Sequence, residues 1–74
     1  MMGKSDGREA LGKNVAAIRL LRGMTQAELA QKAGCSEGFV SRIERGKTGI
    51  SVLMLFRLCC ALECRASELL RDIE

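Results

Sequence analysis

Residues 25–46, TQAELAQKAGCSEGFVSRIERG, decide how this chain folds. The stretch begins with a T-x-x-E capping box, in which the side chains of Thr25 and Glu28 each accept a hydrogen bond from the other residue's backbone amide. A short helix is therefore predicted over about residues 26–33. Gly34 ends it, because glycine adopts the left-handed conformation at little energetic cost.

The second half of the stretch predicts another short helix that crosses the first. Ser36 is its N-cap, and it extends to about Arg45 with Val40 and Ile43 directed into the core. The small side chain of Ala30 lies where the two helices approach each other closely. Two short helices joined by a tight turn that contains glycine are typical of a helix-turn-helix.

Helical patterns continue on both sides of this motif. Apolar residues at spacings of three and four predict a first helix over about residues 10–22, and the polar residues 1–9 are interpreted as a flexible arm. Ser51 is expected to cap a fourth helix, and a short fifth helix is predicted over about residues 66–73. We therefore expect an all-α fold of five helices, with residues 10–74 forming one helix-turn-helix domain.

The composition excludes several classes of function. A chain of 74 residues buries only about 60% of its unfolded surface, which leaves few walls for a deep pocket. The chain has no His, the usual general base and commonest metal ligand. We therefore expect no enzyme, no cofactor and no small-molecule ligand. Neither a membrane-spanning stretch nor a secretory signal is found, so a cytoplasmic protein with no membrane partner is expected.

The four cysteines are expected to be reduced thiols rather than disulfides or metal ligands. The C-C-x-x-x-C spacing over residues 59–64 is not a C-x-x-C knuckle, and no second pair completes a tetrahedral site. Cys60 and Cys64 are expected to be neighbours where the fourth helix ends. An exposed Cys60 on a dimer face would be able to cross-link under oxidation.

Charge is distributed unevenly along the chain. The net charge is +3 over residues 1–32, +1 over residues 33–49 and −1 over residues 50–74. A basic front and a slightly acidic tail fit a protein with one surface that faces an anion. The overall net charge of +3 alone does not identify that anion.

The run LGKNVAAIRLLRGMTQAELAQKAGCSEGFVSRIERGKT resembles the lambda-repressor and Cro-like helix-turn-helix domains, also called the xenobiotic-response-element family. The resemblance covers about residues 10–71, and its most specific parts are TQAELAQKAG and S-x-x-x-V-S-x-I-E-x-G. It implies a five-helix DNA-binding domain that usually acts as a dimer on a palindromic operator. The chain departs from the family pattern at Glu63, where relatives often have Gly, so this corner is expected either to be strained or to follow a different turn.

In such a fold the helix over residues 36–45 lies in the major groove and presents its N-terminal residues to base edges. Arg42 is the strongest candidate, because arginine can form two hydrogen bonds to guanine. Glu37 either accepts from a cytosine amine or interacts with the helix dipole. Phe39 is expected to expose its ring to a thymine methyl, and the alternative is that it packs partly under the helix. Gly38 is either a point of close approach to DNA or a tolerated surface glycine. The expected base contacts are Glu37, Gly38, Phe39, Ser41 and Arg42.

Phosphate contacts are expected at both ends of the motif. Gln26 stands at a helix N-terminus, where free amides attract an anion, and the matching family position contacts a phosphate. The other candidates follow the recognition helix and are Arg45, Lys47 and Thr48. An ordinary solvated lysine is the alternative for Lys47.

Arg19 and Glu44 are assigned a structural role by the resemblance. The matching family positions form a partly buried ion pair that holds the recognition helix against the first helix. Removing one partner of a buried pair strands the other charge, which costs about 3–5 kcal/mol.

The fourth helix carries two apolar stripes. The core stripe is expected to contain Val52, Leu55, Leu58, Cys59 and Leu62. The second stripe, together with the last helix, is interpreted as a homodimer patch or, alternatively, as part of a wide core face. The expected dimer residues are Leu53, Phe56, Cys60, Leu70 and Ile73.

Taken together, these patterns predict a sequence-specific regulator that binds double-stranded DNA. A dimeric repressor on a palindromic operator is the favoured interpretation, with two recognition helices about 34–36 Å apart. The alternative is a restriction–modification controller, or an antitoxin or other protein-interaction module with the same fold.

Overall fold

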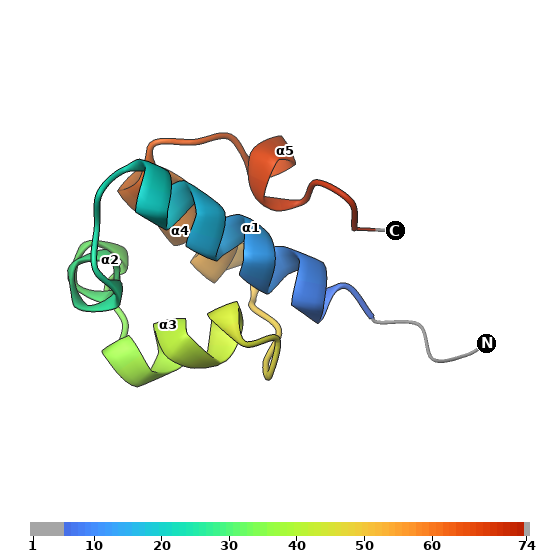
Figure 1. Ribbon diagram of the computed structural model, residues 1–74, viewed down its shortest axis with the longest axis horizontal. Helices are drawn as coiled ribbons and strands as arrows, with labels where there is room; N and C mark the ends of the chain where they lie inside the picture. Colours follow the sequence, from blue (N-terminus) through green and yellow to red (C-terminus); the bar gives the residue numbers. More distant parts are fainter. Residues whose placement is uncertain (1–5, 74) are drawn as a thin grey trace.

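The computed structural model describes residues 6–73, which form five helices and no strand (Figure 1). The elements in chain order are α1 (Arg8–Leu21), α2 (Gln26–Ala33), α3 (Glu37–Glu44), α4 (Val52–Leu62) and α5 (Ala66–Leu69). Figure 1 shows α1 crossing in front of α4, with α3 on one side of α1 and α5 on the other. The predicted all-α, five-helix fold is confirmed.

Local capping bonds explain where the central helices begin and end. The Thr25 hydroxyl accepts from the Glu28 amide at 3.0 Å, and the Glu28 carboxylate accepts from the Thr25 amide at 2.8 Å. The hydroxyls of Ser36 and Ser51 likewise accept from the amides of Phe39 and Met54 and so cap α3 and α4. Gly34 ends α2 with a φ of 76°, a left-handed value that favours glycine.

The core lies where α1, α2, α3 and α4 meet, and α5 closes it. Seven large side chains are completely buried in it: Val15, Leu29, Val40, Ile43, Leu58, Leu62 and Leu69. All five of these helices contribute at least one of them. Val40 and Ile43, the two core residues expected on the recognition helix, therefore anchor α3 in the core.

Gly12 gives α1 its closest approach to α3. A Cβ added there would lie 2.7 Å from the carbonyl oxygen of Glu44 and even closer to that of Ile43. Both oxygens belong to backbone that cannot move aside easily. Gly12 was not among the predicted packing residues, although a glycine inside a helical pattern is a known signal of close packing.

Three predictions are corrected by the structure: where α1 begins, where α5 ends and whether Val52 is buried. Helix α1 begins at Arg8, inside the stretch expected to be an arm, and the Asp6 carboxylate accepts from the Arg8 amide at 3.2 Å. Residues 1–5 of that arm lie outside the described residues. Helix α5 ends at Leu69 rather than near residue 73. The Asn14 side chain donates to the carbonyls of Leu69 and Arg71, at and just after this end.

Val52 is the third correction, since it was expected on the core face of α4 but is 68% exposed. It is the first residue of the helix and lies at the rim of the core. Ile50, from the loop before the helix, packs against the core. A helical pattern alone does not show that the preceding loop can supply this side chain.

Candidate nucleic-acid interface

The outer face of α3 is the candidate surface for DNA. Val40 and Ile43 are completely buried on the inner face, so the orientation of the helix is determined. On the outer face Glu37, Gly38 and Arg42 are exposed. Ser41 is half-buried at the margin. These residues form one strip along the exposed side of the helix.

Phe39 differs from the expectation. Its ring is half-buried and packs against the core, so it does not stand out into solvent. The guanidinium of Arg42, three residues later, lies over the ring at 5.9 Å from its centroid. Residues three apart are neighbours on a helix, so the Arg42 side chain lies over the part of the Phe39 ring that does not pack against the core. The ring is a support for Arg42 rather than a free apolar tip.

The loop after α3 holds basic side chains at the surface. Arg45 and Lys47 are both exposed, and the Lys47 amide donates to the Arg42 carbonyl at 2.9 Å. Thr48 is half-buried, and its hydroxyl donates to the Gly49 carbonyl at 3.1 Å. The loop therefore continues the polar strip beyond the C-terminus of α3.

Gln26 and the ion pair form one network beneath the motif. Arg19 donates to both carboxylate oxygens of Glu44, at 2.7 Å from Nε and 3.1 Å from the second guanidinium nitrogen. The Arg19 and Glu44 side chains are only 12% and 7% exposed. Gln26 Nε2 donates to Glu44 Oε1 at 2.9 Å, which uses one of its two amide hydrogens. The other hydrogen has no partner among residues 6–73.

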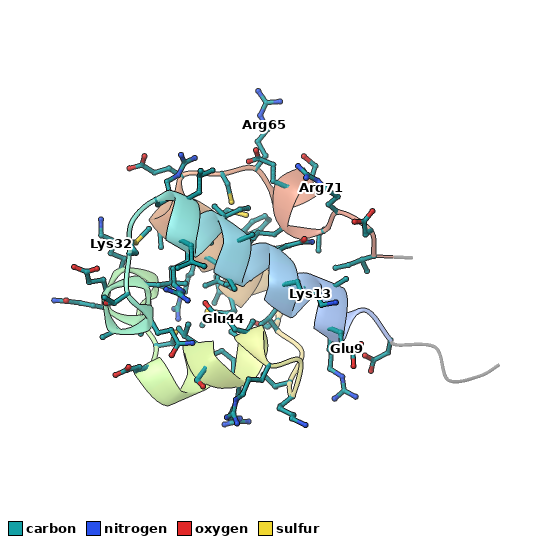
Figure 2. The ribbon with its side chains drawn as sticks, in the orientation of Figure 1. Glu9, Lys13, Lys32, Glu44, Arg65 and Arg71 are labelled. Carbon is teal, nitrogen blue, oxygen red and sulfur yellow. The ribbon has the colours of Figure 1, made fainter. Side chains whose placement is uncertain are left out.

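Figure 2 shows how this network is placed. Glu44 points inward, between α1 and α3, rather than into solvent. Arg65 and Arg71 lie on the α5 side, away from α3. Basic side chains are therefore present on both sides of the molecule. The strip on the outer face of α3 is distinguished by lying along one exposed helix, and not by charge alone.

The cysteines do not form a metal site. Among residues 6–73, no three His, Cys, Asp or Glu side chains come together to hold a metal ion. At the end of α4 the Cys64 amide donates to the Cys59 carbonyl at 3.0 Å, and the thiols of Cys59 and Cys64 interact. Burial raises the pKa of the Cys64 thiol to about 11 and also raises that of Cys59. Both thiols are therefore protonated at neutral pH and react slowly.

Arg22 holds the corner between α4 and α5. Glu63 adopts a φ of 54°, a left-handed value unusual for a residue with a side chain. Arg22 donates at 2.8 Å to the carbonyls of both Leu62 and Glu63. This role was missed, because the two elements are 40 residues apart in the chain. Arg22, the residue that follows α1, thus ties the C-terminal end of α1 to the end of α4.

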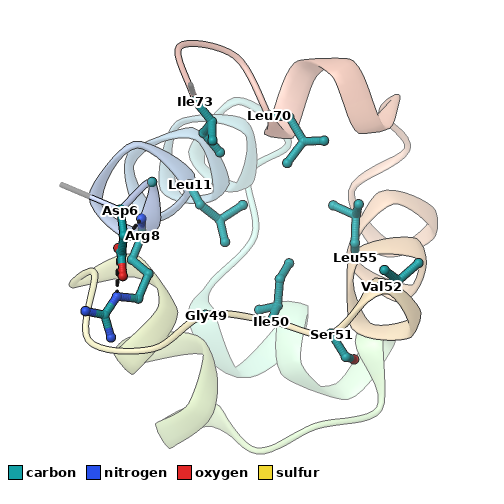
Figure 3. Close-up of a pocket in the computed structure, with 11 residues that line it drawn as sticks. Asp6, Arg8, Leu11, Gly49, Ile50, Ser51, Val52, Leu55, Leu70 and Ile73 are labelled. Atoms are coloured by element: carbon teal, nitrogen blue, oxygen red, sulfur yellow. Dashed lines mark hydrogen bonds and ion pairs between the residues drawn. The ribbon is translucent and has the colours of Figure 1, made fainter.

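The candidate dimer patch is only partly exposed. Leu53 and Phe56 are 60% and 57% exposed, and Cys60 and Leu70 are also exposed. Ile73 is half-buried and packs against the core, so it is less available than expected. Leu70 and Ile73 line a hollow of about 220 Å³. Figure 3 shows them across from Val52 and Leu55 of α4.

No helix within the described part of the chain is long and apolar enough to cross a membrane.

A helix-turn-helix family model matches residues 15–69, which is most of the chain. The chain belongs to the lambda-repressor-like helix-turn-helix family of transcriptional regulators. Its members are DNA-binding regulators and not enzymes.

Individual relatives agree with this assignment. A helix-turn-helix regulator of Sinorhizobium fredii is 36% identical over 64 residues, covering 86% of this chain and 83% of the relative. The transcriptional regulator ClgR of Mycobacterium tuberculosis is 35% identical over 65 residues, which are 88% of this chain but only 58% of ClgR. The chain therefore spans little more than half of that protein.

Solved structures show the same fold. The ClgR structure from C. glutamicum superimposes with a TM-score of 0.81 at 36% identity, covering 85% of this chain and 82% of ClgR. The restriction–modification controller protein C.AhdI from Aeromonas hydrophila gives 0.80 at 28% identity, with 82% and 92% covered. The P22 c2 repressor, solved in complex with a synthetic operator, gives 0.77 at 31% identity, with 82% and 92% covered.

Proposed function

We propose that this chain is a cytoplasmic, dimeric repressor that reads a palindromic operator in double-stranded DNA through α3. The observation that carries the proposal is the division of α3 into two faces. Val40 and Ile43 are completely buried, while Glu37, Gly38 and Arg42 face outward with no part of residues 6–73 covering them. A helix anchored in this way can enter a major groove without unfolding.

The proposed base contacts are divided by chemistry. Arg42 donates to guanine through two hydrogen bonds, held in place by the ring of Phe39 beneath it. Glu37 accepts from a cytosine amine, and Ser41 contacts a base edge at the margin of the strip. Phe39 takes part through Arg42 and not through a thymine methyl.

The proposed phosphate contacts hold the domain in register on the duplex. Gln26 contributes its remaining amide hydrogen at the start of α2, and Arg45 and Lys47 follow α3. Thr48 joins them when its hydroxyl turns from the Gly49 carbonyl to the phosphate. These contacts carry no sequence information by themselves. They supply the part of the affinity that depends on salt.

The proposed dimer uses the exposed apolar side chains of α4 and α5. Leu53, Phe56, Cys60 and Leu70 supply the exposed area, and Ile73 borders it. A two-fold symmetric pair would place two copies of α3 on half-sites one helical turn apart.

Sedimentation velocity tests the dimer. Phe56→Glu is expected to shift the monomer–dimer equilibrium toward monomer, and an unchanged sedimentation coefficient would contradict this interface.

Selection of bound fragments from a random duplex pool tests the central proposal. We expect a palindromic site and a steep fall of affinity with salt.

Arg42→Ala should relax the base preference at one position in each half-site, with a loss of about 1–3 kcal/mol of discrimination. Lys47→Ala should weaken all sequences about equally and reduce the salt slope by about one unit. Identical behaviour of the two variants would contradict the division of roles.

A second candidate function is control of a restriction–modification system. The similarity to C.AhdI supports it, because this chain covers 92% of that controller. In vitro transcription from the selected operator distinguishes repression from activation. A flat salt dependence with no selected site would instead favour a protein-interaction module.

A further inference from the structure

The first turn of α3 contains a glycine that the fold does not require. Gly38 lies inside the helix Glu37–Glu44 and is absent from the residues with positive φ. A Cβ added to it would have Ser36 Oγ as its nearest neighbour, at 4.0 Å, which is ordinary van der Waals contact. The fold offers space for a side chain here, and the backbone conformation accepts one.

Two other glycines show what a structural requirement looks like. At Gly12 an added Cβ would collide with backbone carbonyls of α3. At Gly34 the left-handed φ of 76° excludes most side chains. Gly38 meets neither condition, and glycine in a helix is less stable than alanine. The fold therefore gives no reason of its own for a glycine at this position.

The place of Gly38 on the helix indicates what occupies that space. It is exposed, and it lies four residues before Arg42, which puts the two residues on one face in successive turns. Recognition helices approach base edges with their N-terminal residues. The empty position above Gly38 therefore lies at the end of α3 that would enter the groove most deeply.

We propose that Gly38 is a positioning residue that lets the backbone of the first turn of α3 lie in van der Waals contact with duplex DNA. This inference rests on the proposed function and deepens it. A side chain at this position would hold α3 away from the groove floor and move Arg42 off its base. Stability and DNA affinity should therefore change in opposite directions when the side chain is added.

The test compares Gly38→Ala and Gly38→Leu with the wild-type chain on the operator selected by the wild type. Thermal unfolding of Gly38→Ala is expected to shift upward by roughly 2–8 °C, as for glycine replaced at a compatible position. Operator affinity is expected to fall about tenfold or more for alanine and further for leucine. The salt slope should stay the same, because no phosphate contact is removed.

Gly49→Ala is the matched control, since an added Cβ there meets no atom within 4 Å and its φ is not positive. Its operator affinity should stay within about twofold of the wild type. Full affinity of Gly38→Ala, or a decrease in its melting temperature, would overturn the inference while leaving the proposed function intact. A wild-type chain that selects no duplex would overturn the proposed function, and this inference with it.

Discussion

The two sides of α1 are both held by polar side chains, but against different partners. On the α3 side, Arg19 binds the carboxylate of Glu44, and both side chains are almost buried. On the α5 side, Asn14 and Arg22 donate only to backbone carbonyls at the ends of α5 and α4. An ion pair depends on the identity of both residues, whereas any residue offers a carbonyl. Attachment of the recognition helix is therefore the more sensitive to mutation.

The left-handed residues that end α2 and α4 show the same contrast. Gly34 ends α2 on the α3 side with the residue that this conformation favours. Glu63 ends α4 on the other side with a strained residue, and Arg22 compensates by bonding the carbonyls around it. The amides of Glu63 and Cys64 also bond back into α4, as in a Schellman motif. Tertiary contacts thus replace a local preference at the second corner.

The largest effect is expected from Gly12→Ala on the α3 side. The added Cβ would collide with the last carbonyls of α3, and overpacking against backbone should destabilise the fold by about 3 kcal/mol or more. Urea unfolding followed by circular dichroism measures the loss. Gly49→Ala, which meets no atom, should change little. Equal stabilities of the two variants would contradict the close approach of α1 and α3.

A smaller loss is expected from Glu44→Ala, which leaves Arg19 almost buried without its carboxylate. Removal of one partner from such a pair should cost about 3 kcal/mol, near the lower end of the usual range because Arg19 keeps its bond to the Met24 carbonyl. The double variant Arg19→Met with Glu44→Leu is the control and should recover much of the loss. Similar unfolding midpoints for the single and double variants would argue against a stranded charge.

The smallest effects should come from exchanging the residues at the two corners. Glu63→Gly removes the left-handed strain and should stabilise the fold by up to about 1 kcal/mol. Gly34→Ala introduces that strain and should destabilise it by about the same amount. Differential scanning calorimetry measures both. If Glu63→Gly lowered the melting temperature, the corner would be unstrained and Arg22 would have another role.

Part of the candidate site was predictable from the sequence, because it depends on contacts within one helix. The Ser36 cap and the spacing of Val40 and Ile43 determine which face of α3 turns outward. The half-buried position of Phe39 was not predictable, since its spacing allows either face. The Arg42 stack on that ring then changes the expected role of Phe39 from a base contact to a support.

By itself the sequence determined the number of helices, the caps that begin them and the turn that makes a helix-turn-helix. These features arise from hydrogen bonds and side-chain spacing over three or four residues, which the order of the amino acids contains directly. Only the tertiary structure decided that Gly12 receives the end of α3, that Val52 is exposed and that Arg22 supports Glu63. Those contacts join segments about 30 to 40 residues apart, or depend on whether a neighbouring loop supplies the core side chain, and no local pattern encodes them.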